Sequence, residues 1–399
     1  MRSTPTTAAT DQSMLRRVNE VLILEHMRGR SSLPLSDVSR ATGLSWRTTN
    51  VVAEGLVTAG WLREAEPTAL AGQVGRPARH FRFAAEAGHV AAIDIASAAV
   101  SVAIADLNGR IVHREHDQVD PREEAGSRLA AVAETTARAL QRSGIPADGI
   151  WASTIATSGI VDPNGNITKS VVLRGWDGMS LGDAFGRRFG WRTRVENDCN
   201  LAALAEHWYG QRSDDLIYLL IGTRLGVGLI VRGSLHRGVS GAAGEIGELP
   251  ELGWNTAAAT LAAAAGGDAD ADADASAVFA AARRGDPTAN EAVDVFVDKV
   301  ARGLTAMILT IDPEAVVLGG SFSHAADLLV PRLTSRLAQS CVRAPVVAPS
   351  ELGDASVELG AVRLALDAVL TAVTDLDSTM PLTPSAVRSR LAEAEAAAS

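Results

Sequence analysis

Hydrophobic positions near the N-terminus recur with helical spacing. Four apolar residues of the segment 13–28 fall on or near one stripe of a helix: Leu15, Val18, Leu22 and Met27. This spacing predicts an amphipathic helix, with Ser13 as its N-cap and Gly29 as the residue that stops it.

Two further helices are predicted to follow. One covers 35–41 with Ser36 as its N-cap, and Gly43 supplies the positive φ of the tight turn after it. Ser45 caps another helix over 45–59. Its inward-facing residues are predicted to be Val51, Val52, Leu56 and Val57. A helix, a short glycine turn and a capped helix form the helix-turn-helix arrangement.

A helix-turn-helix places the N-terminal end of its last helix in the major groove of duplex DNA. The side chains predicted to contact DNA at this end are Ser45, Arg47, Thr48, Thr49 and Asn50. Arginine and asparagine make bidentate hydrogen bonds to guanine and adenine edges, and threonine bonds to bases or phosphates. The alternative is an ordinary three-helix domain whose surface happens to carry these residues.

The segment after the third helix predicts a wing. Residues 60–62 start an extended stretch, residues 72–79 form a loop rich in glycine, arginine and proline, and residues 80–83 alternate like a strand. Arg76, between a glycine and a stiffening proline, suits the negative potential of a minor groove, and Arg79 is added to the predicted DNA contacts. The alternative for this loop is a solvated hairpin tip.

Beyond residue 87 the pattern alternates between strands and helices. Strands are predicted around a turn within 90–107 and at 111–112, 150–155 and 217–231, and a helix at 125–142. Such alternation predicts an α/β fold. The predicted domains are a winged helix-turn-helix at 1–86, a ligand-sensing domain at 87–380 and a C-terminal helix or tail at 381–399.

Charge is unevenly distributed over this globular composition. The net charge is −10, yet residues 1–90 hold 11 arginines against 8 acids, so the remainder carries −13. A mildly basic head on an acidic body fits a small DNA-binding unit attached to a domain that stays off DNA. No apolar run reaches the roughly 18 residues that span a bilayer, and the polar N-terminus lacks a secretory signal, so a cytoplasmic protein with no membrane partner is predicted.

Metal and disulfide chemistry is not predicted. The two cysteines, Cys199 and Cys341, are too few for a disulfide scaffold or a cysteine-rich zinc site, and two buried free thiols are expected. Alternating acids at 266–274 lack the glycine and terminal glutamate of an EF-hand loop, which favours a solvated acidic loop.

Short motifs spread from about residue 13 to 370 carry a family resemblance. They are Gly75-Arg76-Pro77; 158–162 with Gly165; Gly175-Trp176; 195–203 with Glu206; 221–223 with Gly226 and Gly228; 237–247; 318–320; and 359–361. In their order and spacing the chain resembles the ROK family of repressors and sugar kinases. It most resembles members that carry a winged helix, such as the N-acetylglucosamine and xylose repressors.

This resemblance implies a two-lobed, actin-like body with sugar bound between the lobes. Asn197 and Glu245 match sugar-binding residues of the family, and Asp198 matches the aspartate that acts as general base in the kinases. Where the family has a histidine that helps bind zinc and sugar, this chain has Glu248, and the cysteine cluster downstream is missing. No zinc is therefore predicted. Glu248 joins the predicted ligand set, either as an acid favouring a cationic ligand or as a solvated loop residue.

Both phosphate-binding hairpins of the family's kinases are altered. The kinases carry Asp-x-Gly-Gly-Thr in the first hairpin, where this chain has Ala96, Ser97 and Ala98 after Asp94, and the second has Arg224 at a usual glycine. Since phosphate loops need backbone amides to approach closely, these changes predict that ATP is not used and that no cofactor is required. Asp198 would then be a hydroxyl acceptor or a structural residue.

Together these features predict a ligand-responsive repressor. Its predicted partners are double-stranded operator DNA and a small-molecule effector, a sugar or sugar derivative, and it would act as a homodimer or homotetramer. One alternative is a ROK-type hexose kinase with an added DNA-binding head. Another is a repressor controlled by a protein partner.

Overall fold

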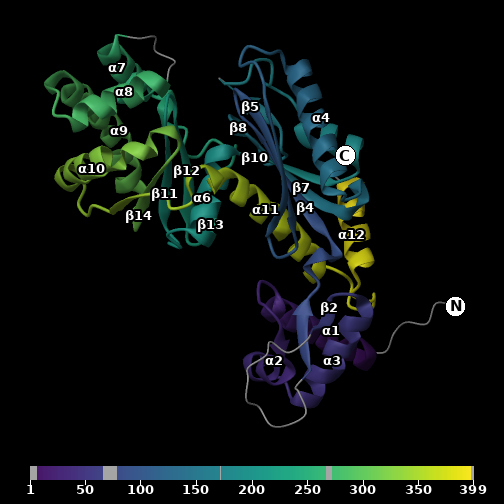
Figure 1. The fold of residues 1–399 in the computed structure, drawn as a ribbon. Helices are drawn as coiled ribbons and strands as arrows, with labels where there is room; N and C mark the ends of the chain where they lie inside the picture. Colours follow the sequence, from purple (N-terminus) through teal and green to yellow (C-terminus); the bar gives the residue numbers. More distant parts are fainter. Residues whose placement is uncertain (1–6, 66–78, 171, 267–271, 397–399) are drawn as a thin grey trace.

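The computed structural model describes residues 7–65, 79–170, 172–266 and 272–396. Figure 1 shows three parts: a small head, residues 7–65 and 79–83, below a first lobe, with a second lobe beside the first. The elements of the head are α1 (Thr7–Met27), β1 (Leu33–Pro34), α2 (Leu35–Thr42), α3 (Trp46–Ala59), β2 (Leu62–Ala65) and β3 (His80–Phe83). Its strands form a sheet in the order β1-β3-β2, which with three helices is a winged helix-turn-helix.

Of the predicted helix caps in the head, one is confirmed and two are wrong. The Thr48 amide donates to Ser45 Oγ at 3.1 Å, so Ser45 caps α3. Ser13 lies inside α1, which begins at Thr7. Ser36 lies inside α2, which begins one residue earlier, directly after Pro34 at its N-cap.

The apolar stripe predicted for α1 is only partly buried. Met27 is fully buried, together with Ile23, whereas Leu15 and Val18 are 63% and 55% exposed. The core of the head therefore meets the C-terminal half of α1. Among the side chains described in the N-terminal half, Arg17 is buried, and it donates to the backbone carbonyls of Leu376 and Met380.

The first lobe is a five-stranded sheet in the order β10-β7-β4-β5-β6. Its strands are β4 (His89–Ile95), β5 (Ala99–Asp106), β6 (Ile111–Gln118), β7 (Ile150–Thr157) and β10 (Arg192–Asn197); β8 (Ile160–Val161) and β9 (Ile167–Lys169) form a separate hairpin. One face packs on α4 (Ala125–Ser143) and α5 (Leu181–Phe189), with Trp176 and Trp191 in the core between them.

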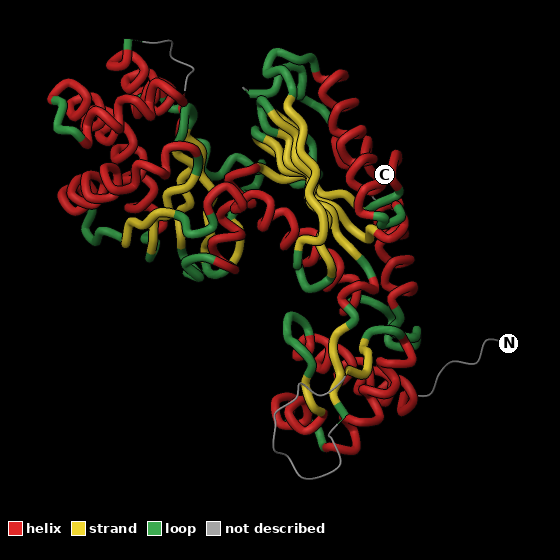
Figure 2. The backbone as a smooth tube through the Cα atoms, viewed as in Figure 1, coloured by secondary structure: helices red, strands yellow, loops and turns green. Residues whose placement is uncertain are grey.

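The second lobe contains a sheet in the order β13-β12-β11-β14-β15. Figure 2 shows the strands of this lobe in yellow and its helices in red. These strands are β11 (Leu216–Ile221), β12 (Leu225–Val231), β13 (Ser234–Leu235), β14 (Ala315–Gly319) and β15 (Val346–Pro349). The helices on its outer face are α7 (Ala257–Ala265), α8 (Asp272–Arg283), α9 (Pro287–Ile311) and α10 (Ala326–Ser340). The predicted α/β, two-lobed body is confirmed.

Two helices join the lobes. α6 (Asp198–Tyr209) packs on β11 and β12 of the second lobe, and α11 (Ser356–Thr374) packs on β4 and β7 of the first lobe and on α6 (Figure 1). The contact is close because Gly360 of α11 lies against the backbone of Leu201, where a Cβ would overlap the carbonyl oxygen. Because the backbones touch, a movement of the first turn of α6 has to displace α11 as well.

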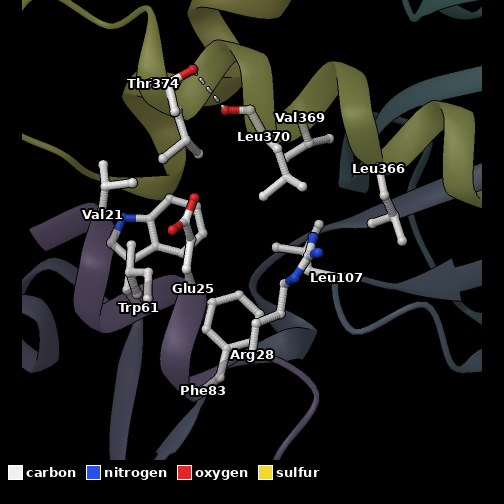
Figure 3. Close-up of a pocket in the computed structure, with 12 residues that line it drawn as sticks. Val21, Glu25, Arg28, Trp61, Phe83, Leu107, Leu366, Val369, Leu370 and Thr374 are labelled. Atoms are coloured by element: carbon white, nitrogen blue, oxygen red, sulfur yellow. Dashed lines mark hydrogen bonds between the residues drawn. The ribbon is translucent and has the colours of Figure 1, made fainter. Parts of the chain in front are cut away.

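The core of the head continues into the first lobe. Trp61, 2% exposed, stacks on Phe83 and meets Trp151 edge-on, with ring centroids 6.1 and 5.9 Å apart. Figure 3 shows Trp61 and Phe83 facing Leu366 and Val369 of α11 across a small cavity of about 50 Å³. The head is thus packed against the body through apolar surface.

A polar clasp reinforces this junction. Residues 375–383 connect α11 to α12 (Pro384–Ala396), and their backbone carbonyls accept hydrogen bonds from the head. Trp61 Nε1 donates to the Leu382 carbonyl at 3.1 Å, and Arg17 donates to that of Met380 at 2.6 Å. Since α12 packs on β7 and β10, the clasp ties the head to the first lobe. No helix in the described part of the chain is long and apolar enough to cross a membrane.

Candidate ligand site and DNA-binding surface

The carboxyl ends of β7 and β10 meet between the lobes. The two strands are parallel, with Asn197 paired to Thr157, so the residues that follow them, Ser158 and Asp198, lie side by side. Ser158 Oγ donates to Asp198 Oδ2 at 2.6 Å, and the Cys199 amide donates to Oδ1 at 2.8 Å. This edge of a parallel sheet is where α/β proteins bind ligands.

A buried glutamate fixes the corner between β10 and α6. Glu196, 3% exposed, accepts hydrogen bonds from the Asn197 amide and from Asn200 Nδ2, both at 2.9 Å, and pairs with Arg237. Asn197 Oδ1 accepts from the Asn200 amide and caps α6, while its Nδ2 donates to the Gly159 carbonyl at 3.0 Å. Asn197 is therefore held rigidly in place, next to Asp198.

Glu245 of the second lobe approaches Asp198, and Glu248 lies near Glu245. Glu245 precedes the 3₁₀ turn Ile246–Glu248, and burial, then the charges of Asp198 and Glu248, raise its pKa. Lys169 of β9 pairs with Glu248, Nζ to Oε2 at 2.6 Å. Lys169 compensates the negative charge of Glu248. The alternative in which Glu248 attracts a cationic ligand is therefore weakened.

Asp198 and Asp94 are carboxyls with raised pKa values. Burial is the main cause at Asp198, where the bond from Ser158 opposes it. Burial, then the charges of Asp198 and Glu358, raise the pKa of Asp94 to about 7. Asp94 lines a cavity of about 320 Å³ in which Glu358 is already paired with Arg114 at 2.8 Å.

Replacing Asp94 with asparagine is expected to stabilise the protein at pH 8. A carboxyl whose folded pKa lies above its unfolded value costs stability as pH rises from 3.8 through about 7, up to roughly 4 kcal/mol at full ionisation. In Asp94→Asn this cost is removed, so the midpoint of thermal unfolding should exceed that of the wild type at pH 8 and converge with it toward pH 4. A gain independent of pH would contradict this account.

The backbone carbonyls of the first hairpin turn, 96–98, accept hydrogen bonds from a buried arginine. Arg128 of α4, 1% exposed, donates from Nη1 to the Ala96 and Ser97 carbonyls at 2.9 and 2.8 Å. In the second hairpin, a Cβ at Gly226 or Gly228 would overlap Cys199 of α6. The close packing of β12 on α6 therefore explains why both positions are glycine, without reference to a phosphate.

The predicted DNA contacts of α3 do not all face outward. Ser45 and Arg47 are exposed, and Thr48 and Asn50 are half-buried. Thr49 is fully buried, with Oγ1 donating to the Ser45 carbonyl at 3.0 Å, so its placement on the DNA-contacting surface is wrong. A threonine can be buried in a helix because its hydroxyl bonds to the carbonyl one turn earlier.

Valine 51 departs from prediction in the opposite direction. Val51 was expected to face inward, yet it is 63% exposed, and Trp46 at the start of α3 is 62% exposed. The sequence predicts Trp46 to be exposed at this end of the helix but leaves it out of the DNA-contacting set, and it misplaces Val51. The sequence does not show which side of the helix faces the core. Val51 and Val52 are both apolar, but only Val52 packs against the core.

The wing is only partly described. Arg76 and the motif Gly75-Arg76-Pro77 lie outside the described residues. Arg79, at the base of the wing, pairs with Glu54 of α3 at 3.0 Å and with Glu64 of β2 at 2.8 Å. These two bonds raise its pKa. Arg79 therefore joins the wing to the outer face of α3.

Metal-binding side chains do not cluster in the parts of the chain that the structure describes. Among them, no group of three or more histidine, cysteine, aspartate and glutamate residues is placed to hold a metal ion. Cys199 is buried and Cys341 partly buried, and both are free thiols.

A winged-helix head on an actin-like, two-lobed body, with polar residues gathered at the ends of two parallel strands, defines the class of sugar-kinase-like proteins that carry a DNA-binding domain. The chain belongs to the ROK family, whose model matches residues 90–368.

Its relatives include both repressors and kinases. The xylose repressor of Caldicellulosiruptor bescii is 21% identical over 395 residues, which cover 90% of this chain and 98% of that protein. The N-acetyl-D-glucosamine kinase of Pasteurella multocida is 29% identical over 238 residues, covering 52% of this chain and 78% of the kinase. A solved ROK family transcriptional regulator, a homologue of the E. coli MLC protein, has a TM-score of 0.69 at 18% identity and covers 96% of this chain and 98% of its own.

Proposed function

We propose that the protein is a cytoplasmic, DNA-binding repressor whose body binds a sugar and thereby alters operator binding. The observation that carries this proposal is the winged-helix head packed directly on a body that retains Asn197, Asp198 and Glu245 around one site. Likeness to the xylose repressor over nearly the whole chain supports it, whereas likeness to the kinase covers about half.

A neutral sugar is the ligand that the site favours. Asp198 and Glu245 supply carboxylate oxygens that accept hydrogen bonds from sugar hydroxyls, and such charge-assisted hydrogen bonds are worth roughly 1.5–3 kcal/mol each. Glu248 is already paired with Lys169, which argues against a ligand chosen for positive charge. We propose Asn197, Asp198 and Glu245 as contacts, with Glu248 and Lys169 closing one side.

Loss of phosphoryl transfer is part of the proposal. Transfer needs phosphate oxygens bound by backbone amides and compensating charge. The turn at 96–98 carries side chains at all three positions, and Arg128 is committed to its carbonyls. Arg224 is exposed at the second hairpin. With neither hairpin built for phosphate, Asp198 serves as a hydroxyl acceptor.

The proposed response travels through α6 and α11. Sugar at Asn197 and Asp198 acts on the first turn of α6, which packs on α11, and α11 borders the head beside Trp61. A ligand that binds one lobe arrangement better shifts the population toward it. In a homodimer or homotetramer, this shift changes the spacing of two heads on a palindromic operator.

A thermal-shift screen of the full chain tests the ligand claim. The panel contains D-xylose, D-glucose, N-acetyl-D-glucosamine, their phosphates and ATP, since ligands of the native state raise the unfolding midpoint. One sugar should raise the midpoint and ATP should not. ATP-dependent phosphorylation of any sugar in the panel would establish a kinase instead.

Replacing Arg47 with alanine is expected to weaken DNA binding about 10- to 100-fold. Arg47 is exposed in the first turn of α3, and a bidentate arginine–guanine pair discriminates by roughly 1–3 kcal/mol. The measurement is the affinity of the full chain for a duplex enriched from a random library. Arg188→Ala, on α5 of the body, is the control and should leave affinity unchanged.

A further inference from the structure

An apolar residue occupies the centre of the outer face of α3. The buried residues of this helix are Thr49, Ala53 and Leu56, whereas Val51 is 63% exposed. At about 100° per residue, Val51 lies roughly 160° around the helix from both Thr49 and Ala53, and so points away from the core. Packing within the head therefore gives no reason for a valine at this position.

Two of the neighbours of Val51 on this face are charged. Arg47 lies one turn before it and Glu54 one turn after it, at the i, i+4 and i+7 positions that share a helix face. Glu54 is neutralised by Arg79 at 3.0 Å. Val51 is thus an apolar side chain between Glu54, which is paired, and Arg47, which forms no ion pair with any of the described residues.

The major groove of duplex DNA presents one apolar group. Its floor carries hydrogen-bond donors and acceptors from every base pair, and the C5-methyl group of thymine is the exception. We propose that Val51 contacts a thymine methyl group, beside the base that Arg47 contacts, and so selects thymine at one position in each half-site. This inference rests on the proposed function, in which α3 enters the major groove.

Deoxyuridine isolates this contact, because it differs from thymidine only in lacking the methyl group. The full-length protein first enriches a preferred duplex from a random library, and each thymine of that duplex is then replaced singly by deoxyuridine. Binding is measured for the wild type, for Val51→Ala and for Val342→Ala. Val342 is a 98% exposed valine of the body, and it serves as the matched control.

At one thymine per half-site, removal of the methyl group should weaken wild-type binding about fourfold, the equivalent of ~0.8 kcal/mol. Val51→Ala should bind the thymine and deoxyuridine duplexes equally, and Val342→Ala should behave as wild type. Because Val51 is exposed and alanine favours helix, the variant should fold.

Two results would overturn the inference. One is a wild type that is indifferent to deoxyuridine at every position, and the other is a deoxyuridine effect that persists unchanged in Val51→Ala. Failure of the proposed function looks different, because no duplex would then be enriched by the wild type or by any variant.

Discussion

Replacing Trp61 with alanine should lower the free energy of unfolding by about 3–5 kcal/mol, the usual cost of deleting a buried large aromatic side chain. Trp61 is 2% exposed and lies where the cores of head and body merge. Its loss enlarges the cavity beside α11, and it leaves the Leu382 carbonyl without its 3.1 Å partner. Chemical denaturation of the full chain measures the change.

The chain offers a matched control for this substitution. Trp46 is 62% exposed, so Trp46→Ala should change the free energy of unfolding by less than about 0.5 kcal/mol. A second variant, Trp61→Phe, keeps an aromatic ring and removes the bond to Leu382, and it should fall between the two. If Trp61→Ala cost no more than Trp46→Ala, the head would not be packed on the body as described.

Replacing Asp198 with asparagine should change ligand affinity and stability in opposite directions. Sugar affinity should fall about 10- to 100-fold, because a charged acceptor of hydrogen bonds from the sugar hydroxyls is lost. Stability at pH 8 should rise, because burial raises the pKa of Asp198 and its ionisation therefore costs free energy in the fold. Titration calorimetry with the stabilising sugar and thermal unfolding measure the two effects.

Asp375→Asn is the control for this pair of effects. Asp375 is exposed just beyond α11, so its variant should match the wild type in both measurements. Opposed changes are typical of a site kept for binding at the expense of stability. If Asp198→Asn lowered stability and left sugar affinity unchanged, Asp198 would be a structural residue.

The sequence predicted the order of elements well because it follows from hydrophobic periodicity and motif order. The helix-turn-helix, the strand pairs over 90–107 and 217–231, and the two-lobed body are all found. Residues within one motif also come together as predicted, since Asn197 and Asp198 lie at the junction of a strand and a helix.

The buried face of α3 and the contacts between residues far apart in the chain could not be predicted from the sequence. Thr49 and Val51 exchange their expected faces because tertiary packing, not polarity, determines which side of α3 is buried. Lys169 and Glu248 are separated by 79 residues, and no periodicity relates them. The clasp on the head uses backbone carbonyls, such as that of Leu382, which carry no sequence signature.

The central claim is that sugar in the body controls DNA binding by the head. The direct measurement is the affinity of the full-length protein for its enriched duplex, by fluorescence anisotropy, with and without the sugar that raises the unfolding midpoint. The account predicts a change in Kd of about 5- to 150-fold in the wild type, the usual range of allosteric coupling, and a much smaller one in Asp198→Asn. An unchanged Kd at saturating sugar in the wild type would contradict it.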